Sequence, residues 1–169
     1  VLPVVPRQGS LGASGDLAPL SHLVLPLIGE GEVDMPDGRR LPCAEALKEL
    51  GWTPLVLGPK EGLALINGTQ MMLGTGLEAM ARIERLADWA DGIGAWSLEA
   101  WNGLADAMYP SIHRVRNQKG AIRTAENVLH WLKGSVRMEQ PRPYVQDPYS
   151  FRCMPQVHGA SRDVMAGVK

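Results

Sequence analysis

The tripeptide Ala13-Ser14-Gly15, within the stretch 7–22, can undergo a covalent rearrangement of its own backbone. The amide nitrogen of Gly15 can attack the carbonyl carbon of Ala13 and close a five-membered ring around Ser14. Loss of two waters, one of which carries the Ser14 hydroxyl, leaves an exocyclic methylidene. Gly15 has no Cβ to block the approach, and Ala13 is small. Taken alone, however, Ala-Ser-Gly is common, and a flexible turn is the simpler interpretation.

The glycines around this tripeptide do not form a phosphate-binding loop. No strand-like segment precedes them, and neither a GxGxxG pattern nor a terminal Gly-Lys-Ser/Thr is present. Asp16 and Pro19 instead indicate the start of a helix. We expect this helix to cover 17–28, with a kink or an early end at Pro26.

A second polar group of interest is the amide of Asn67, which follows an apolar run and precedes Gly68. A buried amide at the head of a helix could direct its donors and its acceptor into a cavity. The alternative is an N-cap for the long helix that follows, and the spacing alone favours this alternative.

A third set consists of Gln146, Tyr149 and Arg152, which fall at steps of three. On a helical turn this spacing places an amide, a phenol and a guanidinium on roughly one face. Such a face could hold an amino acid, with Arg152 paired to its carboxylate. A solvated face with a stacked Tyr–Arg pair explains the pattern equally well.

The three stretches resemble the signatures of the histidine and aromatic amino-acid ammonia-lyases, and the resemblance covers essentially the whole chain. It rests on Ala13-Ser14-Gly15 with its flanks, on Glu-Gly-Leu-Ala-Leu and Asn-Gly-Thr-Gln in 61–70, and on Gln-Asp-x-Tyr-Ser-x-Arg-Cys in 146–153. Cys153 and the words at 155–159 favour the histidine branch. In this family, Ala-Ser-Gly cyclises to the prosthetic group 4-methylideneimidazol-5-one (MIO).

The resemblance implies an ammonia-lyase that converts L-histidine to urocanate through the MIO electrophile. It assigns Ala13, Ser14 and Gly15 to MIO, and Tyr149 to the catalytic residues. It assigns substrate binding to three residues: Asn67, which contacts MIO and substrate, Gln146, and Arg152, which holds the carboxylate. A phenylalanine or tyrosine ammonia-lyase, or an aminomutase that uses the same group, remains an alternative.

Family membership also implies a homotetramer whose active sites are shared between subunits. The family's catalytic-base tyrosine would lie upstream of this stretch and an active-site glutamate downstream, so we expect a central portion of a longer protein. We expect the isolated chain to be inactive, and a helical fragment that folds or associates without catalysis is a further alternative. Such a fragment would keep an intact Ala13-Ser14-Gly15 backbone.

Composition sets wider limits on partners and on location. The chain has 169 residues, of which 45% are hydrophobic, and its formal net charge is −1. We therefore expect no nucleic-acid partner, and no run reaches the roughly 18 apolar residues of a membrane span. Cys43 and Cys153 are too few and too far apart for a disulfide framework or a metal site. We expect free thiols, a cytoplasmic location, an amino-acid substrate, and no metal or nucleotide cofactor.

The periodicity predicts a mainly α fold. The resemblance makes it the long-helix bundle of the ammonia-lyase (fumarase/aspartase-like) type, with a small β-hairpin at 32–41 beside the MIO loop. We expect 1–66 to form the MIO-loop region and 67–169 the start of the central bundle, both within one larger truncated domain. The expected helices are 43–50, a long one from Thr69 towards Pro110, and 121–132. Tryptophans 89, 96 and 101, with Leu98 and Leu104, predict an apolar surface that another chain or segment covers.

Overall fold

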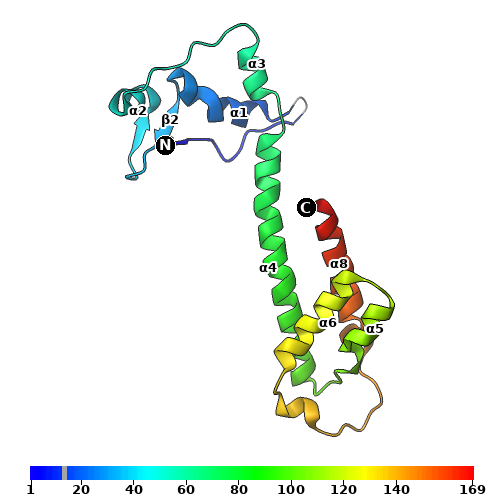
Figure 1. Cartoon of the computed structure of the whole chain (residues 1–169). Helices are drawn as coiled ribbons and strands as arrows, with labels where there is room; N and C mark the ends of the chain where they lie inside the picture. Colours follow the sequence, from blue (N-terminus) through cyan, green and yellow to red (C-terminus); the bar gives the residue numbers. More distant parts are fainter. Residues whose placement is uncertain (13–14) are drawn as a thin grey trace. The chain divides into compact units, whose positions relative to one another are not determined.

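The structure is a computed structural model that describes residues 1–12 and 15–169. It is mostly helical, as the sequence predicts (Figure 1). The chain forms two compact units, Val1–Glu78 and Ala79–Lys169, and each is described by itself. The domain division expected between residues 66 and 67 stays a prediction.

The first unit carries a small antiparallel sheet and several short helices. The sheet has the order β1-β2-β3, with Val33 of β2 paired to Leu41 of β3, so the predicted hairpin is confirmed. The additional strand β1 comes from the proline-rich start of the chain. The elements are β1 (Leu2–Pro3), α1 (Leu17–Val24), η1 (Leu25–Ile28), β2 (Glu32–Asp34), β3 (Arg40–Pro42), α2 (Cys43–Leu50), α3 (Glu61–Ile66) and the first turns of α4 (Gln70–Ala100).

The core of this unit lies between the hairpin and α2. Val33 and Met35 pack against Cys43, Ala46 and Leu47, because the apolar positions of α2 recur at helical spacing. The helix ends where the sequence predicts, at Gly51, whose φ of 70° is a left-handed conformation that glycine adopts without a Cβ penalty.

Pro26 ends the regular part of the first helix. The α-helical hydrogen bonds of α1 stop at Val24, and the next four residues form the 3₁₀ helix η1. A proline has no N–H to donate, so the predicted kink or early end is confirmed at this position. Gly29 follows with φ of 82° and closes the segment.

The second unit contains the rest of α4 and the helices that pack on its C-terminal part. The long helix is confirmed, but it ends at Ala100 rather than continuing to Pro110. Pro110 instead occupies the first turn of α5 (Pro110–Val115), where its missing N–H leaves no bond unmade. The elements after α4 are η2 (Asp106–Met108), α5 (Pro110–Val115), α6 (Lys119–Leu132), η3 (Val136–Glu139), α7 (Tyr149–Arg152) and α8 (Met154–Val168).

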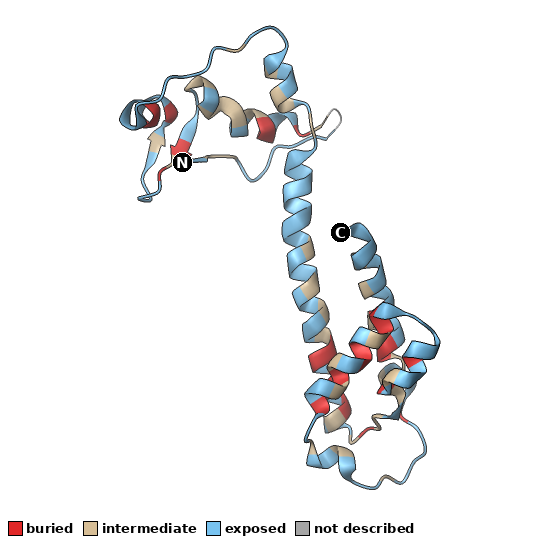
Figure 2. Ribbon diagram, viewed as in Figure 1, coloured by how far each residue is buried: buried red, intermediate tan, exposed pale blue. Residues whose placement is uncertain are grey.

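The buried residues of this unit gather where α4, α6 and α8 meet (Figure 2). Gly120 of α6 lies against Gly159 of α8 so closely that a Cβ on either residue would overlap the backbone of the other helix. The two helices can approach this closely only because both positions lack a side chain. The core residues are Ala95, Leu98, Met108, Val128, Leu132 and Met154.

The aromatic surface predicted along α4 and just beyond it is present in part. Trp89, Trp96 and Trp101 are each about half exposed, whereas Leu98 is fully buried in the core of the unit. Trp96 makes edge-to-face contacts with Trp89 and with Trp131 of α6. What covers the exposed part of these rings remains a prediction.

Candidate active site

Gly15 packs directly against the backbone of Gly68. Its φ is 95°, and a Cβ added to it would lie 2.7 Å from the carbonyl oxygen of Gly68. The next residue, Asp16, donates its backbone N–H to the same oxygen at 2.9 Å. The first and second stretches singled out in the sequence therefore meet at this contact, which admits glycine alone at position 15.

The Asp16 carboxylate fixes the end of the loop. It is 5% exposed and accepts hydrogen bonds from the Ser10 hydroxyl at 3.1 Å and from the backbone N–H of Met72 at 2.8 Å. Asp16 precedes α1, as predicted, but its side chain makes no bond to α1 and satisfies the first turn of α4 instead. One buried side chain thus joins both ends of the 10–16 loop to the start of the long helix.

Two residues assigned to MIO, Ala13 and Ser14, lie outside the described residues. Gly15, the third, is the part of the tripeptide whose surroundings the structure gives.

The exposure of Asn67 and its place in the chain differ from the sequence-based expectation. It is the residue that ends α3, and its backbone N–H donates to the carbonyl oxygen of Leu63. It is exposed rather than buried, and α4 begins only at Gln70, so Asn67 does not head the long helix. The preceding residues 61–66 form a separate short helix, and the exposed Asn67 lies between this helix and Gly68, which contacts Gly15.

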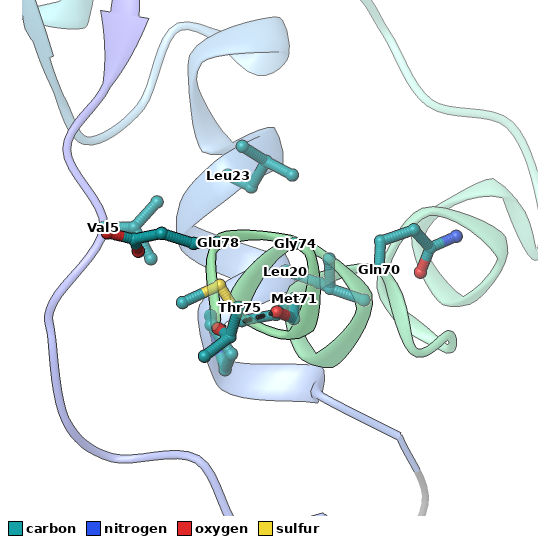
Figure 3. Close-up of a pocket in the computed structure, with 9 residues that line it drawn as sticks. Val5, Leu20, Leu23, Gln70, Met71, Gly74, Thr75 and Glu78 are labelled. Atoms are coloured by element: carbon teal, nitrogen blue, oxygen red, sulfur yellow. Dashed lines mark hydrogen bonds between the residues drawn. The ribbon is translucent and has the colours of Figure 1, made fainter. Parts of the chain in front are cut away.

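A pocket lies beside this junction, between α1 and the first turns of α4 (Figure 3). Leu20 and Leu23 of α1 face Met71 and Thr75 of α4 across it. The Thr75 hydroxyl donates to the carbonyl oxygen of Met71 at 3.0 Å, so its donor is already used within the helix. The pocket walls are mainly apolar, and they include none of the predicted site residues that the structure describes.

In the second unit, Tyr149 and Arg152 form the short helix α7. The guanidinium carbon of Arg152 lies 5.6 Å from the centroid of the Tyr149 ring, and Arg152 Nε donates to the backbone oxygen of Asp147 at 2.9 Å. The stacked pair weighed as an alternative is thus present. A cleft lined by Arg116, Tyr149, Arg152, Cys153 and Gln156 opens beside it.

The step-of-three spacing predicts that Gln146 shares this helical turn, but it does not. The helix begins only at Tyr149, because Pro148 precedes it with extended backbone (φ −52°, ψ 147°) and starts a new segment. Gln146 is exposed in the irregular chain before it. Its amide is therefore placed by a loop, and not by a helix face.

A buried ionic cluster holds α8 to α4. The Asp91 carboxylate is fully buried and lies 2.8 Å from Nδ1 of His158, 2.6 Å from Arg162 and 2.8 Å from Asn127. Burial raises the pKa of Asp91, but the hydrogen bonds from His158, Asn127 and Arg162 outweigh it and hold the pKa below its ordinary value. Arg162 also pairs with Asp88 at 2.8 Å.

Other kinds of site are not seen in the described part of the chain. Within residues 1–12 and 15–169, no group of three or more His, Cys, Asp or Glu side chains could hold a metal ion. In the same residues, no helix has both the length and the apolar character that a membrane crossing requires. Cys43 and Cys153 are free thiols.

The family model for aromatic amino acid lyases matches residues 1–169, which is the whole chain. The chain belongs to this family. It is 52% identical over 173 residues to histidine ammonia-lyase of Anaeromyxobacter dehalogenans (strain 2CP-C), an alignment that covers 96% of this chain and 34% of that protein. The chain therefore spans about one third of the length of the curated relatives that it matches.

Solved structures of this lyase family have the same fold. The crystal structure of ergothionase, an ergothioneine-degrading enzyme from Treponema denticola, superposes with a TM-score of 0.87 at 34% identity, over 97% of this chain and 33% of that one. The crystal structure of tyrosine aminomutase from Streptomyces globisporus superposes with a TM-score of 0.80 at 39% identity, over 98% of this chain and 35% of that one. The predicted helical ammonia-lyase architecture with a small sheet is thereby confirmed.

The residues around Gly15 fit the prosthetic group that the lyase family implies. The position has no space for a Cβ, its φ is positive, and its backbone is held against Gly68 by the neighbouring Asp16. A residue without a Cβ suits a ring closure through the Gly15 nitrogen, since any larger residue would push the segment away from Gly68.

Two buried aspartates, Asp16 and Asp147, belong to the predicted stretches. The sequence indicates only a helix start at Asp16 and no role for Asp147. Their partners, Met72 and Leu104, lie 56 and 43 residues away. Periodicity and local spacing carry no signal for such distant bonds, and only the presence of an acidic residue within each stretch could have drawn attention to them.

Proposed function

We propose that this chain is part of an ammonia-lyase that eliminates ammonia from L-histidine and releases urocanate. Support for the reaction comes from membership of the aromatic amino acid lyase family. Support for histidine comes from the identity of about one half to proteins named histidine ammonia-lyase. The observation that carries the proposal is the contact between Gly15 and Gly68, because it supplies the compressed, side-chain-free backbone that a cyclised Ala13-Ser14-Gly15 needs.

In this proposal Ala13, Ser14 and Gly15 hold the MIO group as part of their own backbone. The group supplies an electrophilic carbon that makes the amino group of the substrate a better leaving group. Gly68 packs against the loop, and Asp16 ties it to α4. The exposed amide of Asn67 lies at the same junction, where it can donate to and accept from a ligand.

Arg152 and Tyr149 would bind and orient the amino acid. Arg152 uses Nε for the backbone of Asp147, which leaves its two terminal nitrogens to grip a carboxylate in the bidentate manner. The Tyr149 hydroxyl and the Gln146 amide, both exposed, would hydrogen-bond around the reacting centre. Fixing the carboxylate restricts the substrate to one geometry before the β-proton is removed.

The complete enzyme would be a cytoplasmic homotetramer with active sites shared between subunits. The half-exposed tryptophans along α4 support this, because contiguous apolar surface of this kind marks an interface. The site would also need the base and the glutamate expected outside this stretch, so residues 1–169 alone would turn over little or no substrate.

The experiment that tests the proposal is a product assay on the full-length protein with L-histidine, L-phenylalanine and L-tyrosine. Urocanate and ammonia should form from L-histidine, and Ser14→Ala should abolish both. The intact mass should fall short of the sequence mass by two waters, and this deficit should vanish in Ser14→Ala. An undiminished mass together with no product would favour the noncatalytic alternative.

A second candidate is an aminomutase, favoured by the similarity to the Streptomyces globisporus tyrosine aminomutase. The same product assay separates the two, because an aminomutase returns a β-amino acid while a lyase stops at the unsaturated acid. Release of the cinnamate-type acid from L-phenylalanine or L-tyrosine, and not from L-histidine, would assign the protein to the other lyase branches.

A further inference from the structure

Asp147 is a buried carboxylate within an exposed loop. It is 3% exposed, whereas its neighbours Gln146 and Pro148 are both exposed. Burying a carboxylate is costly unless it is paired or hydrogen-bonded. The burial of the Asp147 carboxylate therefore indicates a specific structural role, which its contacts define.

One oxygen of Asp147 is bound to the turn that follows α4. Its Oδ2 accepts the backbone N–H of Leu104 at 2.5 Å. Gly103, just before, has no room for a side chain, because a Cβ there would lie 3.0 Å from the same oxygen and would overlap the side chain of Leu98. Oδ1 is buried and has no hydrogen-bond partner within residues 1–12 and 15–169. The carboxylate is thus anchored through one strong, charge-assisted bond.

The backbone carbonyl of Asp147 makes a separate contact and accepts a hydrogen bond from Nε of Arg152 at 2.9 Å. Since a guanidinium is planar, fixing Nε at this carbonyl and placing its central carbon over the Tyr149 ring leaves the group little freedom to rotate. Among the described residues, no hydrogen bond joins the terminal nitrogens of Arg152 to another group, and Arg152 lines the cleft beside α7.

We propose that Asp147 is a positioning residue for Arg152. Its carboxylate holds the loop on the N–H of Leu104, and this places its own carbonyl where it orients the guanidinium towards the carboxylate of the substrate. The inference rests on the proposed function, because it assigns Arg152 to carboxylate binding. It adds to that function a residue that acts on the substrate only through Arg152.

The test is a double-mutant cycle in the full-length protein with L-histidine as substrate. Asp147→Ala and Arg152→Gln should each raise KM about tenfold or more, as expected for the loss of a hydrogen bond to a charged group. The double variant should match Arg152→Gln alone, because Asp147 acts through the guanidinium. Asp147→Asn, which keeps an oxygen acceptor for Leu104, should restore KM to within about threefold of the parent.

Two competitive ligands separate positioning from general damage. Urocanate carries the carboxylate, and histamine is the decarboxylated counterpart of the substrate. Asp147→Ala should weaken urocanate binding and leave histamine binding unchanged, whereas a merely structural defect would weaken both. The matched control is Asp163→Ala, which removes a carboxylate bond to a distant backbone N–H, that of Gly120 at 2.8 Å, without touching Arg152.

The results distinguish a failure of the positioning role of Asp147 from a failure of the carboxylate-binding role of Arg152. A parental KM in Asp147→Ala, effects that multiply in the double variant, or equal loss of both ligands would overturn the positioning role. A parental KM in Arg152→Gln would instead refute the carboxylate role of Arg152 in the proposed function. If Asp147→Ala does not fold, as thermal unfolding would reveal, Asp147→Ser replaces it and the same lack of additivity is expected.

Discussion

The carboxylate of Asp16 accepts a hydrogen bond from the backbone N–H of Met72, 56 residues further along the chain. The first turn of a helix has N–H groups without intrahelical partners, and a negative charge there is favoured by the helix dipole. The residue that follows the predicted prosthetic tripeptide therefore also caps the longest helix. This bond couples the folding of α4 to the placement of Asp16.

Replacing Asp16 with alanine should affect stability and loop chemistry together. Loss of the cap should lower the free energy of unfolding by about 1–2 kcal/mol. It should also reduce the two-water mass deficit, because the loop would lose its side-chain bonds to Ser10 and Met72, and only the backbone N–H of residue 16 would still bind Gly68. Denaturant unfolding and intact mass measure the two effects. Ser10→Ala removes only one of the two bonds to Asp16 and should produce a smaller change in both. Parental stability in Asp16→Ala would contradict the coupling.

Gly15 and Gly12 form a matched pair for testing the compressed backbone. A Cβ at position 15 would lie 2.7 Å from Gly68 and require φ of 95°, whereas a Cβ at position 12 meets nothing within 4 Å. Gly15→Ala should therefore abolish cyclisation and with it the mass deficit, while Gly12→Ala should keep the deficit. Intact mass spectrometry of both full-length variants is the measurement, and equal deficits would show that the contact is not required.

Elements with a local cause could be predicted from the sequence. Three such elements depend only on neighbouring residues, and the structure confirms them. They are the helix Cys43–Leu50 that ends at Gly51, the hairpin around Pro36-Asp37-Gly38, and the early end of the first helix near Pro26. Local chemistry of this kind is visible in any short window of sequence.

Features set by distant contacts could not be predicted in this way. The exposure of Asn67 depends on α3 ending separately from α4, and the loop position of Gln146 depends on Pro148 together with the anchoring of Asp147 on Leu104. The step-of-three spacing at 146–152 is compatible with a helix, but the tertiary bonds favour an irregular loop there.

The Asp91 cluster predicts a pH dependence of stability. The pKa of Asp91 lies below its ordinary value of 3.8, so the folded state favours the ionised form more than the unfolded state does. The stability from this carboxylate is thus fully present above pH 3.8 and is lost as the pH falls through the lower, folded-state pKa. At pH 7, Asp91→Asn should lower the free energy of unfolding by about 3 kcal/mol, because it removes the buried charge that His158 and Arg162 share and leaves Arg162 with only the exposed Asp88.

The measurement for this cluster is denaturant unfolding of the parent and of Asp91→Asn from pH 7 down to pH 2. The difference between them should narrow below pH 3.8, and a constant difference would contradict the assignment. The control is Asp34→Asn, which breaks an exposed pair with Arg40 and should change stability little at any pH.

Gly159 and Gly167 lie on the same helix, α8, and alanine at the two positions should have opposite effects. A Cβ at Gly159 would overlap the backbone of Ala121 in α6, and no flexible side chain is there to move aside. Gly159→Ala should therefore force the helices apart and cost about 1–3 kcal/mol or more. A Cβ at Gly167 meets nothing within 4 Å, so Gly167→Ala should gain up to about 0.5 kcal/mol from helix propensity alone. Thermal and denaturant unfolding of both variants provide the comparison. A neutral Gly159→Ala would mean that α6 and α8 pack less closely than the two glycines permit.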